Sequence, residues 1–225
     1  YNGDEEMFRA VHDMRARIIL ADDFTSEKVI GAILFERTMD DTINDKPVAK
    51  LLWEDRGVVP FLKIDKGLEE TNNGVQMMKP IMEIDDLLSR AVKNGIFGTK
   101  ERSVIHEANE GGIAAVVAQQ FEVGKQILSH GLVPIIEPEV TISISDKPEA
   151  EDLLRDAILE ELNALGDDQD VMLKLTLPEK INQYLPLIEH PCVIKVVALS
   201  GGYSREEANG RLSEQKGMIA SFSRA

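Results

Sequence analysis

The sequence predicts an α/β barrel, in which parallel strands alternate with helices around a common core. Short apolar runs of strand length recur along the 225 residues, and helical patterns separate most of them. The runs are nearly continuous in hydrophobic residues, which is typical of parallel strands covered by helices. Polar or charged residues end most of the runs. A barrel active site needs this arrangement, because it takes residues from the C-terminal ends of many strands.

Seven runs form the predicted strands. In chain order they are VIGAILFE (29–36), VVPFLKID (58–65), GIFGTKER (95–102), LVPIIEPE (132–139), VMLKLTLP (171–178), VIKVVALS (193–200) and GMIASFS (217–223). Each is short and rich in β-branched or other apolar residues. We therefore expect at least seven strands of the barrel in this chain.

Apolar residues spaced three or four positions apart predict the helices between the strands. The five helical segments are residues 1–24, 85–94, 112–130, 147–166 and 205–215. The first has acids in its first turn and a stripe at Met7, Val11, Met14 and Ile18, and Ser204 is the expected N-cap of the last. The segments DDTINDKP (40–47) and EETNNG (69–74) are expected to be surface loops.

An open doubly wound sheet is the alternative architecture. A dinucleotide-binding sheet of that kind has a glycine-rich turn after its first strand, and none occurs there. Gly201 and Gly202 instead follow the sixth predicted strand. We therefore favour the barrel, as a single domain over 1–225 with no linker or internal repeat dividing it.

Composition excludes several classes of protein. The formal net charge of −15 opposes nucleic-acid binding, which needs clustered Lys and Arg. No apolar run approaches 18 residues and no signal-like start is visible, so neither a membrane span nor secretion is expected. The single cysteine, Cys192, excludes an internal disulfide and permits a reducing compartment. We expect a cytoplasmic protein.

Lys174 stands in the middle of a strand that is expected to be buried. Met172, Lys174 and Thr176 share one face of this strand. A buried lysine must be paired or lose its proton, and a neutral amine is a nucleophile that attacks carbonyls to form a Schiff base. The alternative is a structural lysine, paired with a core carboxylate or reaching the rim of the sheet.

Residues that could take part in catalysis or ligand binding lie at the C-terminal ends of six successive predicted strands. They are Lys63 with Asp65, Lys100 with Arg102, Glu137 with Glu139, then Lys174, then Ser200 with Gly201 and Gly202, and finally Arg224. A single charged residue at a strand end is most often solvated or in a salt bridge. That explanation is weaker when six strands all end in such polar or charged residues.

These residue types predict carbonyl chemistry on a phosphorylated substrate. An iminium ion on Lys174 would stabilise a carbanion at the neighbouring carbon, with Glu137 moving protons if burial raises its pKa. A nearby Lys100 would lower the pKa of Lys174 by like-charge repulsion. The backbone N–H groups of Gly201 and Gly202, with Arg224, would hold a phosphate.

The strings GAILFERTM, GVVPFLKIDKG, FGTKERS, GLVPIIEPEV, VMLKLTLP, VVALSGGYS and MIASFSRA together resemble class I fructose-1,6-bisphosphate aldolase, most closely its short bacterial form. The resemblance extends over essentially the whole chain. It implies the (β/α)8 barrel fold, a lyase of glycolysis and gluconeogenesis, and a reaction that needs no metal or other cofactor. It also implies that assembly is often oligomeric, so a homo-oligomer is one expectation.

The resemblance also assigns roles to individual residues. Lys174 matches the Schiff-base lysine, Glu137 the general acid/base and Glu139 its neighbouring acid. Lys100 and Arg102 match residues beside the reacting carbons, and Lys63 matches a pocket lysine. Ser200, Gly201 and Arg224 match residues that hold the ketose C1 phosphate. The expected reaction is reversible cleavage of fructose 1,6-bisphosphate to dihydroxyacetone phosphate and glyceraldehyde 3-phosphate.

The chain departs from the family pattern at both ends. Family members begin with a further strand–helix unit, whose aspartate acts in carbon–carbon cleavage, and they continue past SFSRA into a last helix. We therefore expect a fragment of the full barrel, in which Asp65 does not take the role of that aspartate.

Three alternative functions stay open at this point. A deoxyribose-phosphate aldolase or a transaldolase would share the strand lysine and the phosphate site. A binding or scaffold protein would keep the site without turnover. A zinc-dependent aldolase is disfavoured, because His12, His106, His130 and His190 lack metal-ligand spacing.

Overall fold

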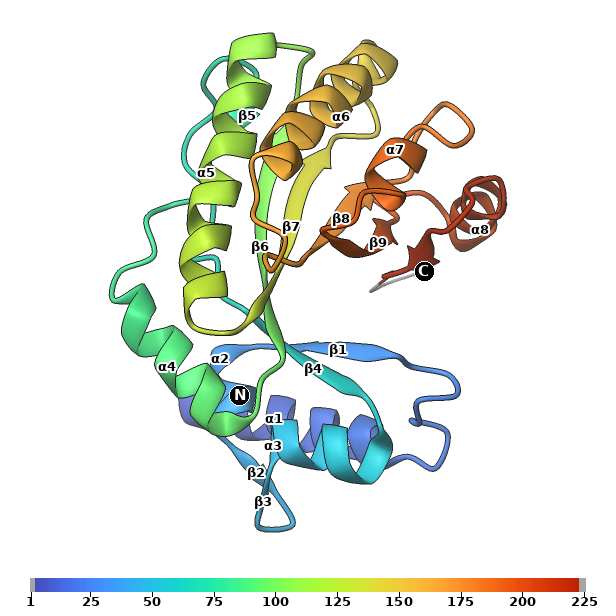
Figure 1. Ribbon diagram of the computed structural model, residues 1–225. Coiled ribbons are helices and arrows are strands. Elements are labelled where there is room, and N and C mark those ends of the chain that lie inside the picture. The colour runs from blue at the N-terminus through green and yellow to red at the C-terminus, as the bar shows by residue number, and fades with distance from the viewer. Residues whose placement is uncertain (1–2, 223–225) are drawn as a thin grey trace. The chain divides into compact units, whose positions relative to one another are not determined.

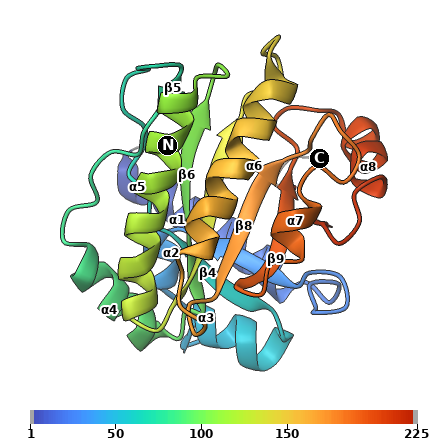
Figure 2. The ribbon, with the colours of Figure 1, turned by 45° about the horizontal axis from the view of Figure 1, so that its top comes forward.

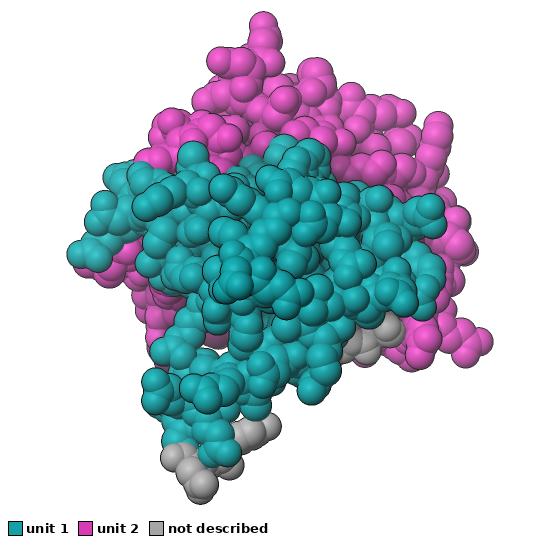
Figure 3. All heavy atoms as spheres, turned by 90° about the horizontal axis from the view of Figure 1, so that it is seen from below, with its two compact units in different colours: residues 1–64, 83–99 teal, residues 65–82, 100–225 magenta. Residues whose placement is uncertain are grey.

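The structure, a computed structural model, describes residues 3–222. Residue contacts divide the chain into two compact units (Figure 3). Unit 1 comprises residues 1–64 and 83–99, and unit 2 comprises residues 65–82 and 100–225. Strand β6 (Gly98–Ile105) begins in unit 1 and continues in unit 2. The single-domain organisation expected for 1–225 stays a prediction.

Unit 1 contains two adjacent parallel strands and the helices around them (Figure 1). Its elements are α1 (Asp4–Leu20), β1 (Gly31–Leu34), α2 (Glu36–Met39), β2 (Thr42–Ile43), β3 (Lys46–Pro47), α3 (Val48–Lys50), the π-helical turn η1 (Leu51–Asp55), β4 (Val59–Lys63) and α4 (Ile84–Asn94). In the β1–β4 pair, Gly31 lies opposite Val59 and Leu34 lies opposite Leu62. The Phe97 N–H donates to the Pro60 carbonyl at 2.9 Å, which starts β6 alongside β4.

Helix α4 shows why the sequence forms these elements. Leu87, Leu88 and Ala91 recur at helical spacing and are buried, so one face of the helix packs into the core of unit 1. Gly95 ends the helix with φ 83°, a left-handed conformation that glycine adopts without a steric penalty. The predicted helix 85–94 is therefore confirmed to within one residue.

Two expectations for unit 1 were wrong. The predicted loop 40–47 contains the antiparallel hairpin of β2 and β3, whose turn residues Asn44 and Asp45 both have positive φ. Such turns suit the twist of a hairpin, and Asn and Asp tolerate the left-handed region. The expected apolar stripe of α1 is also largely exposed, since Met14 is 44% and Ile18 is 50% accessible.

Unit 2 is a set of parallel strands with helices between them (Figure 1). Its elements are β5 (Val75–Gln76), the main part of β6, α5 (Glu110–Ser129), β7 (Val133–Val140), α6 (Lys147–Asn163), β8 (Val171–Thr176), α7 (Leu185–Ile188), β9 (Val193–Leu199), α8 (Arg205–Ser213) and β10 (Ile219–Ala220). The strands follow the order β6-β7-β8-β9-β10. The pairs β7–β8, β8–β9 and β9–β10 are parallel, and β5 pairs antiparallel with β6.

Helices α5, α6 and α7 lie on one face of the unit 2 strands (Figure 2). Their apolar residues, including Phe121 and Ile158, form one buried cluster with Leu173 and Leu175 of β8. This packing occupies the helix-facing side of β8. Since side chains alternate along a strand, Lys174 is directed to the opposite face.

All seven predicted strands form, as β1, β4, β6, β7, β8, β9 and β10. All five predicted helices form too, as α1, α4, α5, α6 and α8. The expected N-cap of α8 is confirmed, because the Ser204 hydroxyl accepts a hydrogen bond from the Glu207 N–H at 3.2 Å. The sequence missed the short helices α2, α3 and α7, which are too brief to show a period.

Candidate active site

Three adjacent strands of unit 2 bring the predicted catalytic residues together. Lys100 lies on β6, Glu137 on β7 and Lys174 on β8. Ile136 pairs with Leu173 in the β7–β8 register, so the next residues along the two strands, Glu137 and Lys174, are neighbours. The parallel register therefore brings together residues that are 37 positions apart in the chain.

The Glu137 carboxylate bridges the two lysines. Its Oε1 lies 3.0 Å from Lys174 Nζ, and its Oε2 lies 2.9 Å from Lys100 Nζ. Lys100 Nζ also donates to Asp65 Oδ2 at 3.2 Å. The side chains are almost fully enclosed, with 11% of Lys174, 7% of Lys100 and 4% of Glu137 exposed. Two ammonium groups thus face two carboxylates in a largely dry environment.

The charges around Lys100 keep it protonated. Burial alone lowers the pKa of Lys100, but the Glu137 and Asp65 carboxylates together outweigh burial and raise that pKa above its ordinary value. Lys100 is therefore a fixed positive charge on the far oxygen of Glu137. Its predicted like-charge effect on Lys174 stays a prediction.

The backbone of Glu137 is fixed by helix α5. The Glu137 N–H donates to Gln120 Oε1 at 2.8 Å, and Gln120 Nε2 in turn donates to Ser103 Oγ on β6 at 3.0 Å. Gln120 is fully buried. Sequence reasoning missed this glutamine. The one available signal was a polar residue on the apolar face of an otherwise hydrophobic helix.

Thr176 joins the C-terminal ends of β7 and β8. Its hydroxyl accepts from the Val140 N–H and donates to the Val140 carbonyl, both at 2.9 Å. Both backbone groups of Val140 are thus satisfied by a single side chain. This contact was also missed, although it holds together the two strands that carry Glu137 and Lys174.

Arg102 and Glu139 form a second pair on the same two strands as Lys100 and Glu137. Arg102 Nη1 lies 2.9 Å from Glu139 Oε2. Arg102 is more open, with 42% of its side chain exposed, so it is accessible to a ligand. Lys63, the remaining strand-end lysine, is half-buried at the end of β4 in unit 1.

A tight turn follows β9 at the predicted phosphate residues. The Tyr203 N–H donates to the Ser200 carbonyl at 3.0 Å, and the central residues Gly201 and Gly202 have φ of 61° and 114°. A Cβ on Gly201 would lie 2.7 Å from Ile142 Cγ2, so glycine is required there for two reasons. Arg224 lies outside the described residues.

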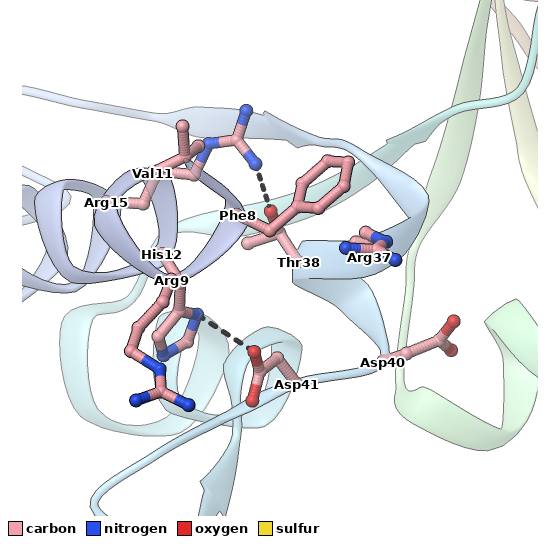
Figure 4. A pocket seen from close by; sticks show the side chains of 9 residues that line it. All are labelled: Phe8, Arg9, Val11, His12, Arg15, Arg37, Thr38, Asp40 and Asp41. Atoms are coloured by element: carbon pink, nitrogen blue, oxygen red, sulfur yellow. Dashed lines mark hydrogen bonds and ion pairs between the residues drawn. The ribbon is translucent and has the colours of Figure 1, made fainter. Parts of the chain in front are cut away.

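A pocket of about 430 Å³ lies within unit 1, between α1 and α2 (Figure 4). Three of its residues are arginines, namely Arg9, Arg15 and Arg37, and their guanidinium groups point apart in Figure 4. Arg15 donates to the Thr38 hydroxyl at 2.6 Å, and Arg37 stacks on the Phe8 ring. The lining contains none of the strand-end residues predicted from the sequence.

Two further features bear on the function class. In residues 3–222, no three His, Cys, Asp or Glu side chains are grouped in a way that could hold a metal ion. No helix in this described range has the length and apolar content needed to cross a membrane.

The alternation of strands and helices, with lysines and carboxylates paired near the strand ends, is typical of α/β-barrel enzymes. Comparison with known proteins gives a more specific assignment. The model of the family described as fructose-bisphosphate aldolase class-I matches residues 4–183. The chain is 56% identical, over all of its 225 residues, to fructose-bisphosphate aldolase class 1 of Synechocystis sp., and it covers 75% of that protein. It is equally similar to the Clostridium acetobutylicum protein of the same name, of which it covers 76%.

A solved structure shows the same fold. The fructose-bisphosphate aldolase of Plasmodium falciparum superposes with a TM-score of 0.74 over 99% of this chain and 78% of that one, at 20% sequence identity. The chain belongs to the class I fructose-bisphosphate aldolase family. It is therefore a lyase with the (β/α)8 barrel fold, and the resemblance noted in the sequence is confirmed.

Proposed function

We propose that this chain cleaves fructose 1,6-bisphosphate reversibly through a Schiff base on Lys174, yielding dihydroxyacetone phosphate and glyceraldehyde 3-phosphate. Family membership supports the overall reaction, in which a lysine takes the place of a metal ion. The observation that carries the residue assignment is the Glu137 carboxylate, which contacts Lys174 through one oxygen and Lys100 through the other.

The first step is formation of the imine. Lys174 becomes nucleophilic when it passes a proton to Glu137 Oε1, 3.0 Å away, and its nitrogen then attacks the ketose C2 carbonyl. The carbonyl oxygen takes up the proton that the attacking nitrogen gives up, which yields a neutral carbinolamine. Protonated Glu137 then supplies a proton to this hydroxyl group, which leaves as water. An iminium ion remains on Lys174.

The second step breaks the carbon–carbon bond. The electron pair of the C3–C4 bond moves into the iminium to form an enamine, while the C4 hydroxyl releases its proton to solvent and becomes the aldehyde of glyceraldehyde 3-phosphate. The enamine takes up a proton from solvent at C3, and water then hydrolyses the imine to release dihydroxyacetone phosphate and restore the Lys174 amine. Lys100 stays charged throughout, because despite burial the Glu137 and Asp65 carboxylates raise its pKa.

The phosphate groups are the basis of substrate recognition. The Ser200–Gly202 turn presents backbone N–H groups ahead of helix α8, and Arg102 is the accessible cation of unit 2 near the lysines. We assign the ketose C1 phosphate to Ser200, Gly201, Gly202 and Arg224. Arg102 and Glu139 are assigned to the sugar chain and the second phosphate, and the substrate role of Lys63 stays a prediction.

Trapping of the imine tests this proposal. The protein is incubated with dihydroxyacetone phosphate and reduced with borohydride, and the adduct is located by peptide mass spectrometry. We expect the adduct on Lys174 with or without EDTA. Lys174→Ala should lose it, Glu137→Gln should form it more slowly, and the exposed Lys216→Ala should behave as wild type. An adduct of equal yield in Lys174→Ala would overturn the assignment.

A substrate panel tests the choice among lysine aldolases. We expect cleavage of fructose 1,6-bisphosphate in preference to deoxyribose 5-phosphate or sedoheptulose 7-phosphate. If an adduct forms but none of the three sugar phosphates is cleaved, a binding protein is favoured instead.

We also propose a cytoplasmic homo-oligomer with one domain. The single cysteine is compatible with a reducing compartment, and exposed apolar side chains on α1, such as Met14 and Ile18, are compatible with assembly. Light scattering coupled to size-exclusion chromatography measures the mass. A monomer at micromolar concentration contradicts the oligomer.

A further inference from the structure

A third enclosed lysine lies in unit 2, at the start of helix α6. Only 2% of Lys147 is exposed. Its ammonium group donates to Glu151 Oε1 at 2.6 Å, to the Leu177 carbonyl at 2.9 Å and to Glu179 Oε1 at 3.1 Å. An ammonium has three N–H groups, so this lysine is fully satisfied. Leu177 and Glu179 belong to the segment that directly follows the strand of Lys174.

Glu179 is the shared acceptor of the network. Besides Lys147, its Oε1 accepts from the Tyr203 hydroxyl at 3.1 Å and lies 3.2 Å from Arg211 Nη1. Its backbone N–H donates to Glu151 Oε2 at 3.0 Å. Both its main chain and its side chain are therefore fixed. Because Glu151 is itself completely buried, the anchor lies in the core rather than at the surface.

Tyr203 carries this constraint to the turn after β9. Its backbone N–H closes the Ser200–Tyr203 turn, its ring packs on the Arg211 guanidinium at 4.3 Å, and its hydroxyl donates to Glu179. Burial, with the Glu179 carboxylate, raises the pKa of Tyr203 to about 12, so the hydroxyl keeps its proton at neutral pH. The donor is thus available throughout the physiological range.

The turn needs such a brace because of its glycines. Gly201 and Gly202 have more accessible backbone conformations than other residues, and ordering them when a ligand binds costs conformational entropy. A turn that is already held in place avoids that cost at binding. The contact between Tyr203 and Glu179 does this from outside the turn.

We propose that Tyr203 is a positioning residue, which holds the glycine turn in place through Glu179 and Lys147 and so sets the affinity for the phosphate of the ketose substrate. This inference rests on the proposed function, because it takes the turn to be a phosphate site. It predicts that loss of the Tyr203 hydroxyl weakens recognition of phosphate and leaves imine chemistry at Lys174 intact.

The test compares two ketones that differ only in phosphate. Imine trapping is measured against the concentration of dihydroxyacetone phosphate and of dihydroxyacetone. For Tyr203→Phe we expect the half-saturating concentration of dihydroxyacetone phosphate to rise about threefold to tenfold, in line with the net contribution of one typical hydrogen bond. The values for dihydroxyacetone and the maximal trapping rate should not change.

Tyr184→Phe is the matched control. The Tyr184 hydroxyl is buried and, among the described residues, has no hydrogen-bond partner. Removing it deletes the same atom from the same unit without touching the turn, so neither ketone should be affected. Glu179→Gln is a second test variant, and it should also raise the half-saturating concentration of dihydroxyacetone phosphate. The two effects should not add in the double variant, because both act through one contact.

The outcomes separate this inference from the proposed function. Equal weakening of both ketones in Tyr203→Phe would show a purely structural role and overturn the positioning role, and so would unchanged affinity for dihydroxyacetone phosphate. Titration calorimetry with inorganic phosphate provides a readout independent of the imine. Wild type that binds phosphate more tightly than Tyr203→Phe supports the inference even if no adduct forms on Lys174, whereas the missing adduct overturns the proposed function.

Discussion

Two buried lysines of unit 2 have opposite surroundings. Lys147 donates to three acceptors, which uses every N–H of its ammonium group. Lys174 has a single carboxylate oxygen within ion-pair distance among the described residues, Glu137 Oε1. A fully satisfied ammonium has no N–H group left for another partner, whereas a sparsely held one keeps N–H groups for other partners. The structural lysine and the proposed Schiff-base lysine differ more clearly in these contacts than in burial.

The largest expected effect is at the reactive lysine. Lys174→Met should lower kcat for fructose 1,6-bisphosphate on the order of 10³-fold or more, because no other group supplies the covalent electron sink. Its stability should change little, since Glu137 still pairs with Lys100. Steady-state cleavage rates and urea unfolding measure the two quantities. If Lys174→Met lost much of its stability but kept its kcat, Lys174 would be a structural lysine rather than the Schiff-base lysine.

Lys147→Met should have the opposite effects, with a large loss of stability and little change in kcat. It leaves Glu151 buried without its cation, which costs roughly 3–5 kcal/mol of unfolding free energy. Adding Glu151→Leu should recover much of that stability, because the pair is then replaced by apolar groups of similar size. Urea denaturation of the single and double variants measures this. A double variant no more stable than Lys147→Met would argue against an ion-pair origin.

Gly201→Ala should produce a smaller loss. The added Cβ meets Ile142 Cγ2, and the φ of 61° is strained for alanine, so about 1–3 kcal/mol is expected. The half-saturating concentration of dihydroxyacetone phosphate should rise as well. Gly210→Ala is a matched control, since a Cβ there meets nothing within 4 Å. If Gly201→Ala and Gly210→Ala changed the thermal unfolding temperature equally, the turn would not be sterically tight at Gly201.

The smallest expected effects concern pH. The pKa of Lys100 is raised in the folded protein, so its ion pairs stabilise fully below the unfolded value near 10.5 and are lost as pH rises through the higher folded value. Lys100→Met should therefore lose less stability than wild type between pH 10 and pH 12. Urea unfolding at closely spaced pH values checks the difference.

Glu179 should make stability depend on pH in the acid range, as Lys100 does in the alkaline range. Burial raises the pKa of Glu179, but hydrogen bonds and charge from Lys147, with Arg211 and Tyr203, outweigh burial and lower that pKa below 4.5. Its stabilisation is present above pH 4.5 and is lost as pH falls through the folded value. Glu179→Gln should flatten the stability curve below pH 4.5, which urea unfolding at a series of acid pH values measures.

Strand positions and strand-end chemistry could be predicted from the sequence. Lys174, Glu137 and Lys100 were found because a charged residue inside an apolar run is conspicuous in one dimension. Their mutual contacts follow once parallel strands are placed side by side. The Arg102–Glu139 contact between β6 and β7 arises in the same way.

The supporting contacts could not be predicted in this way. Gln120, Thr176 and Lys147 act through partners that lie 17 to 36 positions away on other elements. In the sequence each is an ordinary polar residue in a helix or strand. Their importance depends on which element packs against them, which a one-dimensional pattern does not record.

The bridging carboxylate has a consequence for the energy of the reaction. Lys100, Lys174, Glu137 and Asp65 together carry zero net charge when all are ionised. When a proton passes from Lys174 to Glu137, the sum is still zero. In the proposed reaction, the nucleophile is therefore prepared by moving a proton over one hydrogen bond, with no ion released to or drawn from the solvent. Salt should accordingly weaken attraction of the phosphorylated ketose but leave this enclosed transfer largely unscreened.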